Sequence, residues 1–251
     1  MTDRLAALRS SVEHLASLIG DVDVPVPESP AFPSDWSIAD TMSHLGSGAV
    51  IMKANVENVL ARRAGTTDFN QSVWDVWNAK SPSDQVTDAL VAITTLQEHL
   101  ESLTEDQRGE FRFVMGPFDL DFDGYVGLRL NEQALHTWDI DVVLDPTATL
   151  SDEVAGVIVD DIGTIVRLAG AAHGEEKVVR VRTSAPARDL ALIFSGDAIE
   201  LQEARHSDEI DVRISSEAFI RLVYGRLASV PDSFADDREQ IESLRTSFPG
   251  F

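Results

Sequence analysis

Apolar residues recur at three- and four-residue intervals in five segments, and this spacing predicts amphipathic helices. In the first segment the repeating residues are Leu5, Leu8, Val12, Leu15 and Leu18. The helices are expected at residues 3–19, from about 36 to 63, at 82–103, from just after Gly124 to Asp145-Pro146, and at 151–170. Four helices with one long connection suggest a bundle, and the fifth would be an extra helix.

The spacing changes near Lys177, where apolar and polar residues begin to alternate as they do in strands. Four short strands are expected at 178–183, 189–194, 198–202 and 210–214, followed by helices at 217–227 and 236–246. Such a run of strands and helices is typical of a small α+β module. The predicted fold class is therefore a helical bundle over residues 1–172 followed by an α+β domain over residues 177–251.

Two segments between the helices have no regular pattern, and one histidine needs separate mention. Residues 66–80 are expected to be irregular, with Trp74 and Trp77 either covering the bundle as a hydrophobic lid or lining a pocket. Residues 109–121 are expected to form an extended crossover. His99 lies among polar residues near a helix end, so it is expected to face solvent.

The composition is that of a globular protein, with 43% hydrophobic and 25% charged residues. The formal net charge is −23, from 20 Lys and Arg against 43 Asp and Glu. Because such a field repels phosphate groups, nucleic acid and anionic membranes are not expected partners. An anionic substrate would need a few local arginines or a metal ion. The acidity itself is explained equally well as an aid to solubility.

The chain contains no cysteine, which excludes disulfides, Cys-ligated zinc and a protein thiol nucleophile. Sulfur chemistry would therefore require a small thiol from outside. No apolar leader follows Met1, and no apolar run approaches the ~18 residues of a membrane-spanning helix. We therefore expect a cytoplasmic protein.

The strongest candidate for chemistry is the segment RLNEQALHTWDID, residues 129–141. On a helix, Glu132 and His136 lie four residues apart and therefore on one face. A carboxylate and an imidazole in this arrangement can share a metal ion or a proton. Such pairs also occur as ordinary helix-surface pairs that contribute ~0.2–0.5 kcal/mol.

His44 is the second candidate, on the helix that begins near Trp36. A histidine on an apolar helix face is usually a core residue, but Asp40 four residues earlier is placed to accept its second ring N–H. Gly46 and Gly48 leave room for a ligand beyond it. Two imidazoles and one carboxylate are suitable ligands for zinc or another divalent metal. Three protein ligands leave one position open, as catalytic metal sites do.

These motifs resemble the mycothiol-dependent maleylpyruvate isomerase family, part of a wider group of DinB-like metal-binding helix bundles. The matching residues are Trp36-Ser37-Ile38-Ala39-Asp40 with His44-Leu45-Gly46, and later Arg129, Glu132 and His136-Thr137-Trp138-Asp139-Ile140. The resemblance covers about the first 170 residues. It implies that His44, Glu132 and His136 bind a divalent metal, usually zinc, and that mycothiol is the thiol used.

The order of strands and helix in the second part resembles the sterol-carrier-like C-terminal domain of many members of this family. In some of them an arginine of this domain reaches the metal site. The segment FIRLVYGR, residues 219–226, resembles the family's helix ending in Gly-Arg, which makes Arg226 and, less directly, Arg221 candidate catalytic residues. An arginine can hold a substrate carboxylate through two parallel hydrogen bonds. Both arginines can equally be solvated or cap the helix end.

The resulting hypothesis is an enzyme in which a metal-activated thiolate attacks a small electrophile, as an isomerase or an S-transferase. Two alternatives remain open: metal-assisted hydrolysis, with water in place of the thiol, and a metal-bearing protein that only binds a small ligand. A small-molecule electrophile and a thiol are the expected partners. The sequence leaves the substrate, the metal and the oligomeric state open.

Overall fold

The computed structural model describes residues 3–20, 27–32, 35–115 and 118–250. The chain divides into two compact units, Met1–Ala148 and Thr149–Phe251. The first is a helical bundle and the second combines helices with a mixed sheet, so the predicted fold class is confirmed. No helix among the described residues is long and apolar enough to cross a membrane.

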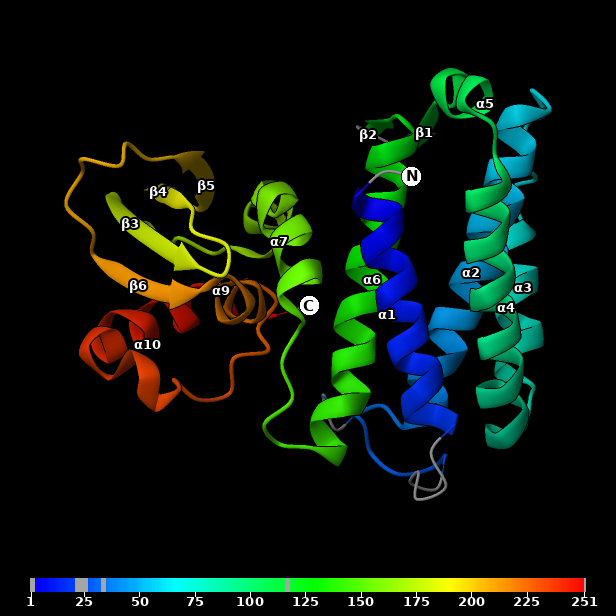
Figure 1. The fold of residues 1–251 in the computed structure, drawn as a ribbon, viewed down its shortest axis with the longest axis horizontal. Coiled ribbons are helices and arrows are strands. Elements are labelled where there is room, and N and C mark those ends of the chain that lie inside the picture. Colours follow the sequence, from blue (N-terminus) through cyan, green and yellow to red (C-terminus); the bar gives the residue numbers. More distant parts are fainter. Residues whose placement is uncertain (1–2, 21–26, 33–34, 116–117, 251) are drawn as a thin grey trace. The chain divides into compact units, whose positions relative to one another are not determined.

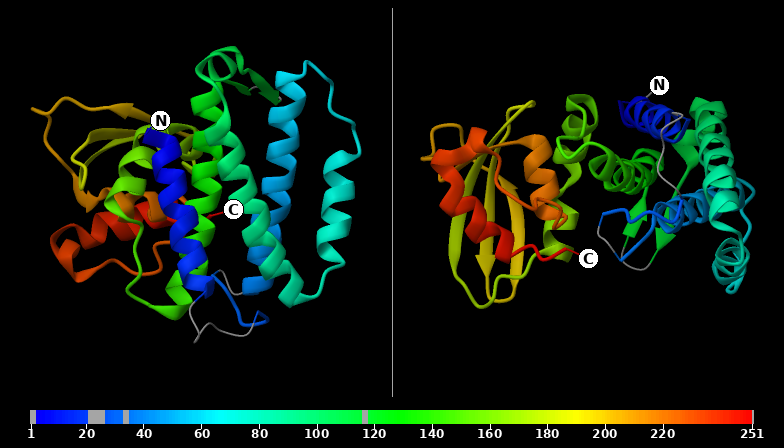
Figure 2. Two further views of the ribbon diagram at one scale, coloured as in Figure 1. Left: turned by 45° about the vertical axis from the view of Figure 1, so that its right-hand side comes forward. Right: turned by 90° about the horizontal axis from the view of Figure 1, so that it is seen from below.

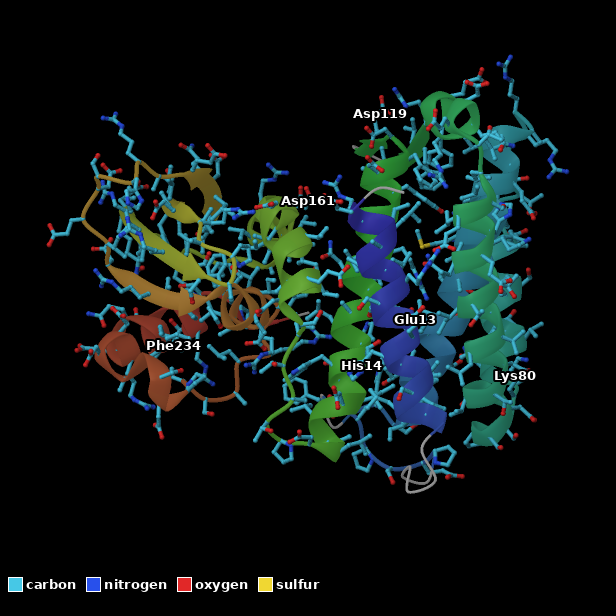
Figure 3. All side chains as sticks on the ribbon, in the orientation of Figure 1. Glu13, His14, Lys80, Asp119, Asp161 and Phe234 are labelled. Atoms are coloured by element: carbon cyan, nitrogen blue, oxygen red, sulfur yellow. The ribbon has the colours of Figure 1, made fainter. Side chains whose placement is uncertain are left out.

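Four long helices build the first unit, and each packs against two of the others (Figures 1 and 2). Helix α1 contacts α4 and α6, and α2 contacts the same two helices. His14 of α1, labelled in Figure 3, makes a 2.7 Å hydrogen bond with Asp141 of α6. The bounds are α1 (Asp3–Gly20), α2 (Ile38–Leu60), α4 (Pro82–Ser102) and α6 (Phe122–Leu144).

Helix α2 begins where its capping residues place it. Ser37 accepts a hydrogen bond from the backbone N–H of Asp40 at 3.0 Å, and the Asp40 carboxylate accepts one from the backbone N–H of Ser37, also at 3.0 Å. This reciprocal capping box satisfies two backbone donors that the first helical turn leaves free. It also commits the Asp40 side chain to the helix end.

Gly46 allows α2 to pack closely against α4. A Cβ atom at position 46 would lie 2.3 Å from the Trp77 ring and 2.9 Å from the Cα of Ala89. Trp77 is buried there, whereas Trp74 is 44% exposed. The glycine is therefore used for packing of the protein itself, and Trp77 covers the bundle as the lid interpretation proposed.

The structure corrects the expectation for residues 66–80, because Phe69–Asn78 forms helix α3. Val73 and Trp77 are its buried residues, four positions apart, so one apolar stripe holds this short helix against α2. The crossover region also contains more structure than a single extended segment. It consists of α5 (Glu105–Glu110) and an antiparallel pair, β1 (Phe113–Met115) and β2 (Phe118–Leu120).

The second unit contains a four-stranded sheet in the order β5-β4-β3-β6. β3 pairs with β4 in antiparallel and with β6 in parallel orientation, and α9 packs on β3 and β6. The strands are β3 (Lys177–Ser184), β4 (Asp189–Ser195), β5 (Ala198–Glu203) and β6 (Val212–Ser215). The helices are α7 (Asp152–Asp161), α8 (Gly163–Ala169), α9 (Ser216–Val223), the 3-10 helix η1 (Asp232–Asp237) and α10 (Arg238–Thr246).

The expected fifth helix of the bundle lies in the second unit. It is divided at Ile162 into α7 and α8, which pack against α9 and β5. The apolar periodicity of residues 151–170 predicted helix but could not indicate which partner would cover it. Along the sequence the division between the two compact units falls between Ala148 and Thr149, whereas the sequence analysis placed the boundary at residues 172–177.

Candidate metal centre

His44, Glu132 and His136 lie together in the bundle. Nε2 of His44 is 2.9 Å from Oε2 of Glu132, and Nε2 of His136 is 3.7 Å from the same oxygen. One ligand atom of each residue lies within 4.8 Å of those of the other two. The structure thus brings together the three residues that the sequence patterns selected. Their role as metal ligands stays a prediction.

The antiparallel packing of α2 against α6 creates this arrangement. His44 meets Glu132, and two turns further along α2 the Tyr125 hydroxyl donates a hydrogen bond to the carbonyl of Met52 at 3.2 Å. Residue numbers therefore rise along α2 while those of the facing residues of α6 fall, so the two helices are antiparallel. Because Glu132 and His136 are one helical turn apart, both can reach the imidazole of His44.

Glu132 is held in its anionic form. Burial alone would raise the pKa of this carboxyl group, but a hydrogen bond from His44 and the electrostatic effects of His136, His44 and Arg129 lower it below its usual value. The side chains of His44 and Glu132 are 42% and 44% exposed, so the cluster is open to solvent on one side. An anionic, accessible carboxylate is the form that binds a cation.

Asp139 fixes the ring of His136. One carboxylate oxygen lies 2.8 Å from Nδ1 of His136, and the Asp139 side chain is fully buried. With Nδ1–H donating to this carboxylate, the lone pair of Nε2 points toward Glu132 and His44. The sequence analysis assigned such a role to Asp40 on His44. That assignment is wrong, because the Asp40 carboxylate accepts from the backbone and hydroxyl of Ser37.

Trp36 covers the two imidazoles and was given no role by the sequence analysis. Its ring stacks on His136 with 17° between the planes and 5.7 Å between the centroids. It is also tilted over His44 at 5.3 Å. The indole is 38% exposed, so it forms an apolar wall at the edge of the cluster.

A buried polar chain continues along α6 from the cluster. Arg129 donates from Nη2 to Oε1 of Gln133 at 2.8 Å, and Gln133 donates to Oγ1 of Thr137 at 3.3 Å. Burial lowers the pKa of Arg129 to about 10, against the opposing effects of Glu132 and Tyr125. The guanidinium therefore remains positively charged at neutral pH.

The donor set fits a divalent metal. Two imidazole nitrogens and one carboxylate oxygen are suitable zinc ligands, and the carboxylate behind His136 is the outer contact that commonly orients such a ligand. Three protein ligands would leave a coordination position for an exogenous group. A metal ion held by these residues would act there as a Lewis acid.

The two candidate arginines belong to the second unit. Arg221 donates from Nη2 to the buried carboxylate of Glu217 at 3.1 Å, and a second bond between the same side chains involves Nε. Arg226 donates to the carbonyl of Tyr224 at 3.3 Å and lies 5.8 Å from the centre of its ring. Arg221 is thus bound within its own helix, whereas Arg226 follows the positive-φ Gly225 after the helix end. A catalytic role for either stays a prediction.

Fold and site together define a class of protein: a helical bundle that carries a His–Glu–His cluster, followed by a small mixed α/β unit. The sequence matches the family described as mycothiol maleylpyruvate isomerase N-terminal domain over residues 5–141. The chain belongs to this family. No curated protein matches the sequence.

Two solved structures are similar over nearly the whole chain. One is the crystal structure of the mycothiol-dependent maleylpyruvate isomerase, with a TM-score of 0.61 and 12% sequence identity. The other is a histidine-to-alanine mutant of an enzyme with the same name, with a TM-score of 0.63 and 11% identity. Each match covers 91% of this chain and 94% of the other. At this identity the likeness establishes the fold.

Proposed function

We propose that this protein is a metal-dependent enzyme that uses a low-molecular-weight thiol, mycothiol, to act on a small electrophile as an isomerase or S-transferase. The observation that carries the proposal is the convergence of His44, Glu132 and His136 within 4.8 Å. Membership of the isomerase family supports the choice of thiol. The absence of cysteine agrees with sulfur that comes from outside the chain.

His44, Glu132 and His136 would hold the metal, and zinc is the ion that best suits these ligands. When bound, the metal would lower the pKa of a coordinating thiol, so that the thiolate is present at neutral pH. Glu132 is already anionic and needs no deprotonation. Asp139 keeps His136 in the tautomer that presents Nε2.

The thiol supplies a nucleophile that adds reversibly to an activated double bond, giving cis–trans isomerisation on release, or that displaces a leaving group, giving transfer. Trp36 excludes water from one side of the cluster and restricts the rotation of both imidazoles. We further propose that Arg226 holds a substrate carboxylate. Arg221 is the weaker candidate, because Glu217 already neutralises its guanidinium.

The test is a turnover assay of the zinc-loaded protein on maleylpyruvate and on generic electrophiles, with and without mycothiol. Thiol-dependent turnover is expected. Glu132→Gln should lower both metal content and kcat, and Arg226→Ala should raise KM for an anionic substrate at unchanged metal content. The matched control is Glu98→Gln, an exposed carboxylate on α4, which should change neither.

Other outcomes would replace the proposal. Turnover that is independent of the thiol would indicate hydrolysis by metal-activated water. A fully metallated protein without turnover on any electrophile would indicate a protein that binds a small ligand.

A further inference from the structure

Arg129 carries a buried positive charge that no carboxylate of the described residues contacts. Arg129 is 2% exposed, and in the described part of the chain no carboxylate forms an ion pair with its guanidinium. A guanidinium offers five N–H donors. One Nη2 hydrogen is bound by Gln133, and Nε–H has no acceptor among the described residues. A buried charge without a counter-charge is unfavourable, so an anion that reached it would be stabilised there.

The position of Arg129 relative to the metal centre follows from the antiparallel packing of α2 and α6. His44 faces Glu132, Gly48 faces Arg129, and Met52 faces Tyr125. Three or four residues of helix correspond to a rise of about 5–6 Å. Arg129 therefore lies about one helical turn further along the two helices than the His–Glu–His cluster.

Gly48 places no side chain of its own against the guanidinium. A Cβ atom at this position would lie 3.5 Å from Nη1 of Arg129, an ordinary van der Waals contact. Because Gly48 is one turn beyond His44 on α2, this side of the guanidinium belongs to the same helix face as the metal ligand.

Gln133 holds Arg129 without neutralising it. The Gln133 side chain is fully buried, and its amide accepts a hydrogen bond from Arg129 and donates one to the Thr137 hydroxyl. The Thr137 hydroxyl in turn donates to the backbone carbonyl of Gln133 at 2.7 Å. The guanidinium is thus fixed in orientation before any ligand binds. A glutamate here would have supplied an internal counter-charge, whereas the amide leaves the positive charge available.

We propose that Arg129 is an inner anion site, which binds the carboxylate of a small ligand whose other end reaches the metal cluster. The metal-directed end of this ligand rests on the proposed function, but the anion site does not. A carboxylate beside Nη1 would supply the missing counter-charge through charge-assisted hydrogen bonds. The site would therefore select short thiols or electrophiles that carry a carboxylate over uncharged ones of equal length.

Three probes test this on the cobalt-loaded protein. Mercaptopropionate ends in a carboxylate where mercaptopropanol ends in a hydroxymethyl group. Binding of either thiol to the cobalt ion is measured by the sulfur-to-cobalt absorption band. Propionate lacks the thiol and is followed by calorimetry. We expect the wild-type protein to bind mercaptopropionate at least about tenfold more tightly than mercaptopropanol, since hydrogen bonds to a charged group contribute about 1.5–3 kcal/mol.

Arg129→Gln should abolish this preference and the binding of propionate while leaving mercaptopropanol within about twofold. Gln133→Glu keeps the arginine and gives it an internal carboxylate, so it should fold and should lose the same preference. Arg63→Gln, which removes an exposed positive charge at the end of α2, is the matched control and should behave as wild type.

The outcomes separate the two proposals. If neither probe thiol nor mycothiol, added as a further ligand, alters the cobalt spectrum, the proposed thiol chemistry fails, whereas propionate binding that depends on Arg129 still supports the anion site. Equal binding of the carboxylate probes by wild type and Arg129→Gln overturns the anion site. Equal weakening of both thiols by Arg129→Gln also overturns it, because Arg129 then acts only by keeping Glu132 ionised.

Discussion

The buried carboxylate of Asp139 lies 2.8 Å from Nδ1 of His136, whereas Nε2 of the same ring faces Glu132. With Nδ1–H donated to this carboxylate, the imidazole is held in the tautomer with a free lone pair on Nε2. Trp36 stacks on the face of the same ring, so the rotation of the His136 imidazole is limited by Asp139 at its edge and by Trp36 on its face.

Asp139→Asn should weaken zinc binding by about 10- to 100-fold, the usual effect of removing an outer contact to a metal ligand. Competition with a chromophoric chelator measures this affinity. Asp141→Asn is the matched control. It removes another carboxylate of α6 that contacts a histidine, in this case His14 of α1. An equal loss in both variants would show that the effect is not specific to His136.

The purified protein should contain about one divalent metal ion per chain, because one cluster of suitable ligands is found among the described residues. Elemental analysis after dialysis against a weak chelator provides the measurement. The double variant His44→Ala, His136→Ala should lose the metal. Full occupancy in that variant would mean that the ion is bound elsewhere.

Gly46→Ala should destabilise the bundle by about 1–3 kcal/mol, because its Cβ would collide with the Trp77 ring and the backbone of Ala89. Gly48→Ala is the control within the same helix. It meets only an ordinary contact at 3.5 Å and should gain up to about 1 kcal/mol from helix propensity. Denaturant unfolding of both variants gives the comparison, and equal effects would contradict the packing role of Gly46.

The sequence was informative wherever a property depends on local spacing. The long helices follow from apolar residues at three- and four-residue intervals, and Glu132 and His136 were found because four residues make about one turn. The i, i+3 spacing of His136 and Asp139 was equally visible and would have identified the carboxylate behind the ring.

Other features depend on packing between distant segments. The neighbourhood of Arg129 and Gly48 is set by the antiparallel register of α2 and α6, which periodicity does not determine. Trp36 could be placed over the imidazoles only once the start of α2 was fixed by its capping box. The short helix α3 was missed because its apolar stripe consists of only Val73 and Trp77.

Limited proteolysis should cut the native protein first at residues 143–149 and more slowly at 172–177. Residues 143–147 are exposed and comprise the end of α6 and the residues after it, just before the division between the two compact units. Ala172 is buried, and Gly174 is held by a backbone hydrogen bond to Gly196 at 2.9 Å. Mass spectrometry of the first fragments locates the cut. A first cut at 172–177 would support the boundary expected from the sequence.

His99 should make the protein less stable as the pH falls below neutral. The sequence predicted that it faces solvent, but it is half-buried, and its Nε2 is inaccessible and has no hydrogen-bond partner among the described residues. Burial, together with the positive charge of Lys53, lowers its pKa in the folded protein, although Glu57 acts in the opposite direction.

The sign of the effect follows from proton linkage. The unfolded chain, with an ordinary histidine pKa of about 6.5, binds a proton more readily than the folded protein, so acidification favours unfolding. The free energy of unfolding should therefore fall from about pH 7.5 to pH 5.5 more steeply in wild type than in His99→Gln. His173→Gln, at an exposed loop position, is the control and should follow wild type. The metal cluster is the same in all three proteins, so its own pH dependence cancels in the differences. Parallel curves for wild type and His99→Gln in urea unfolding would show that His99 titrates alike in both states.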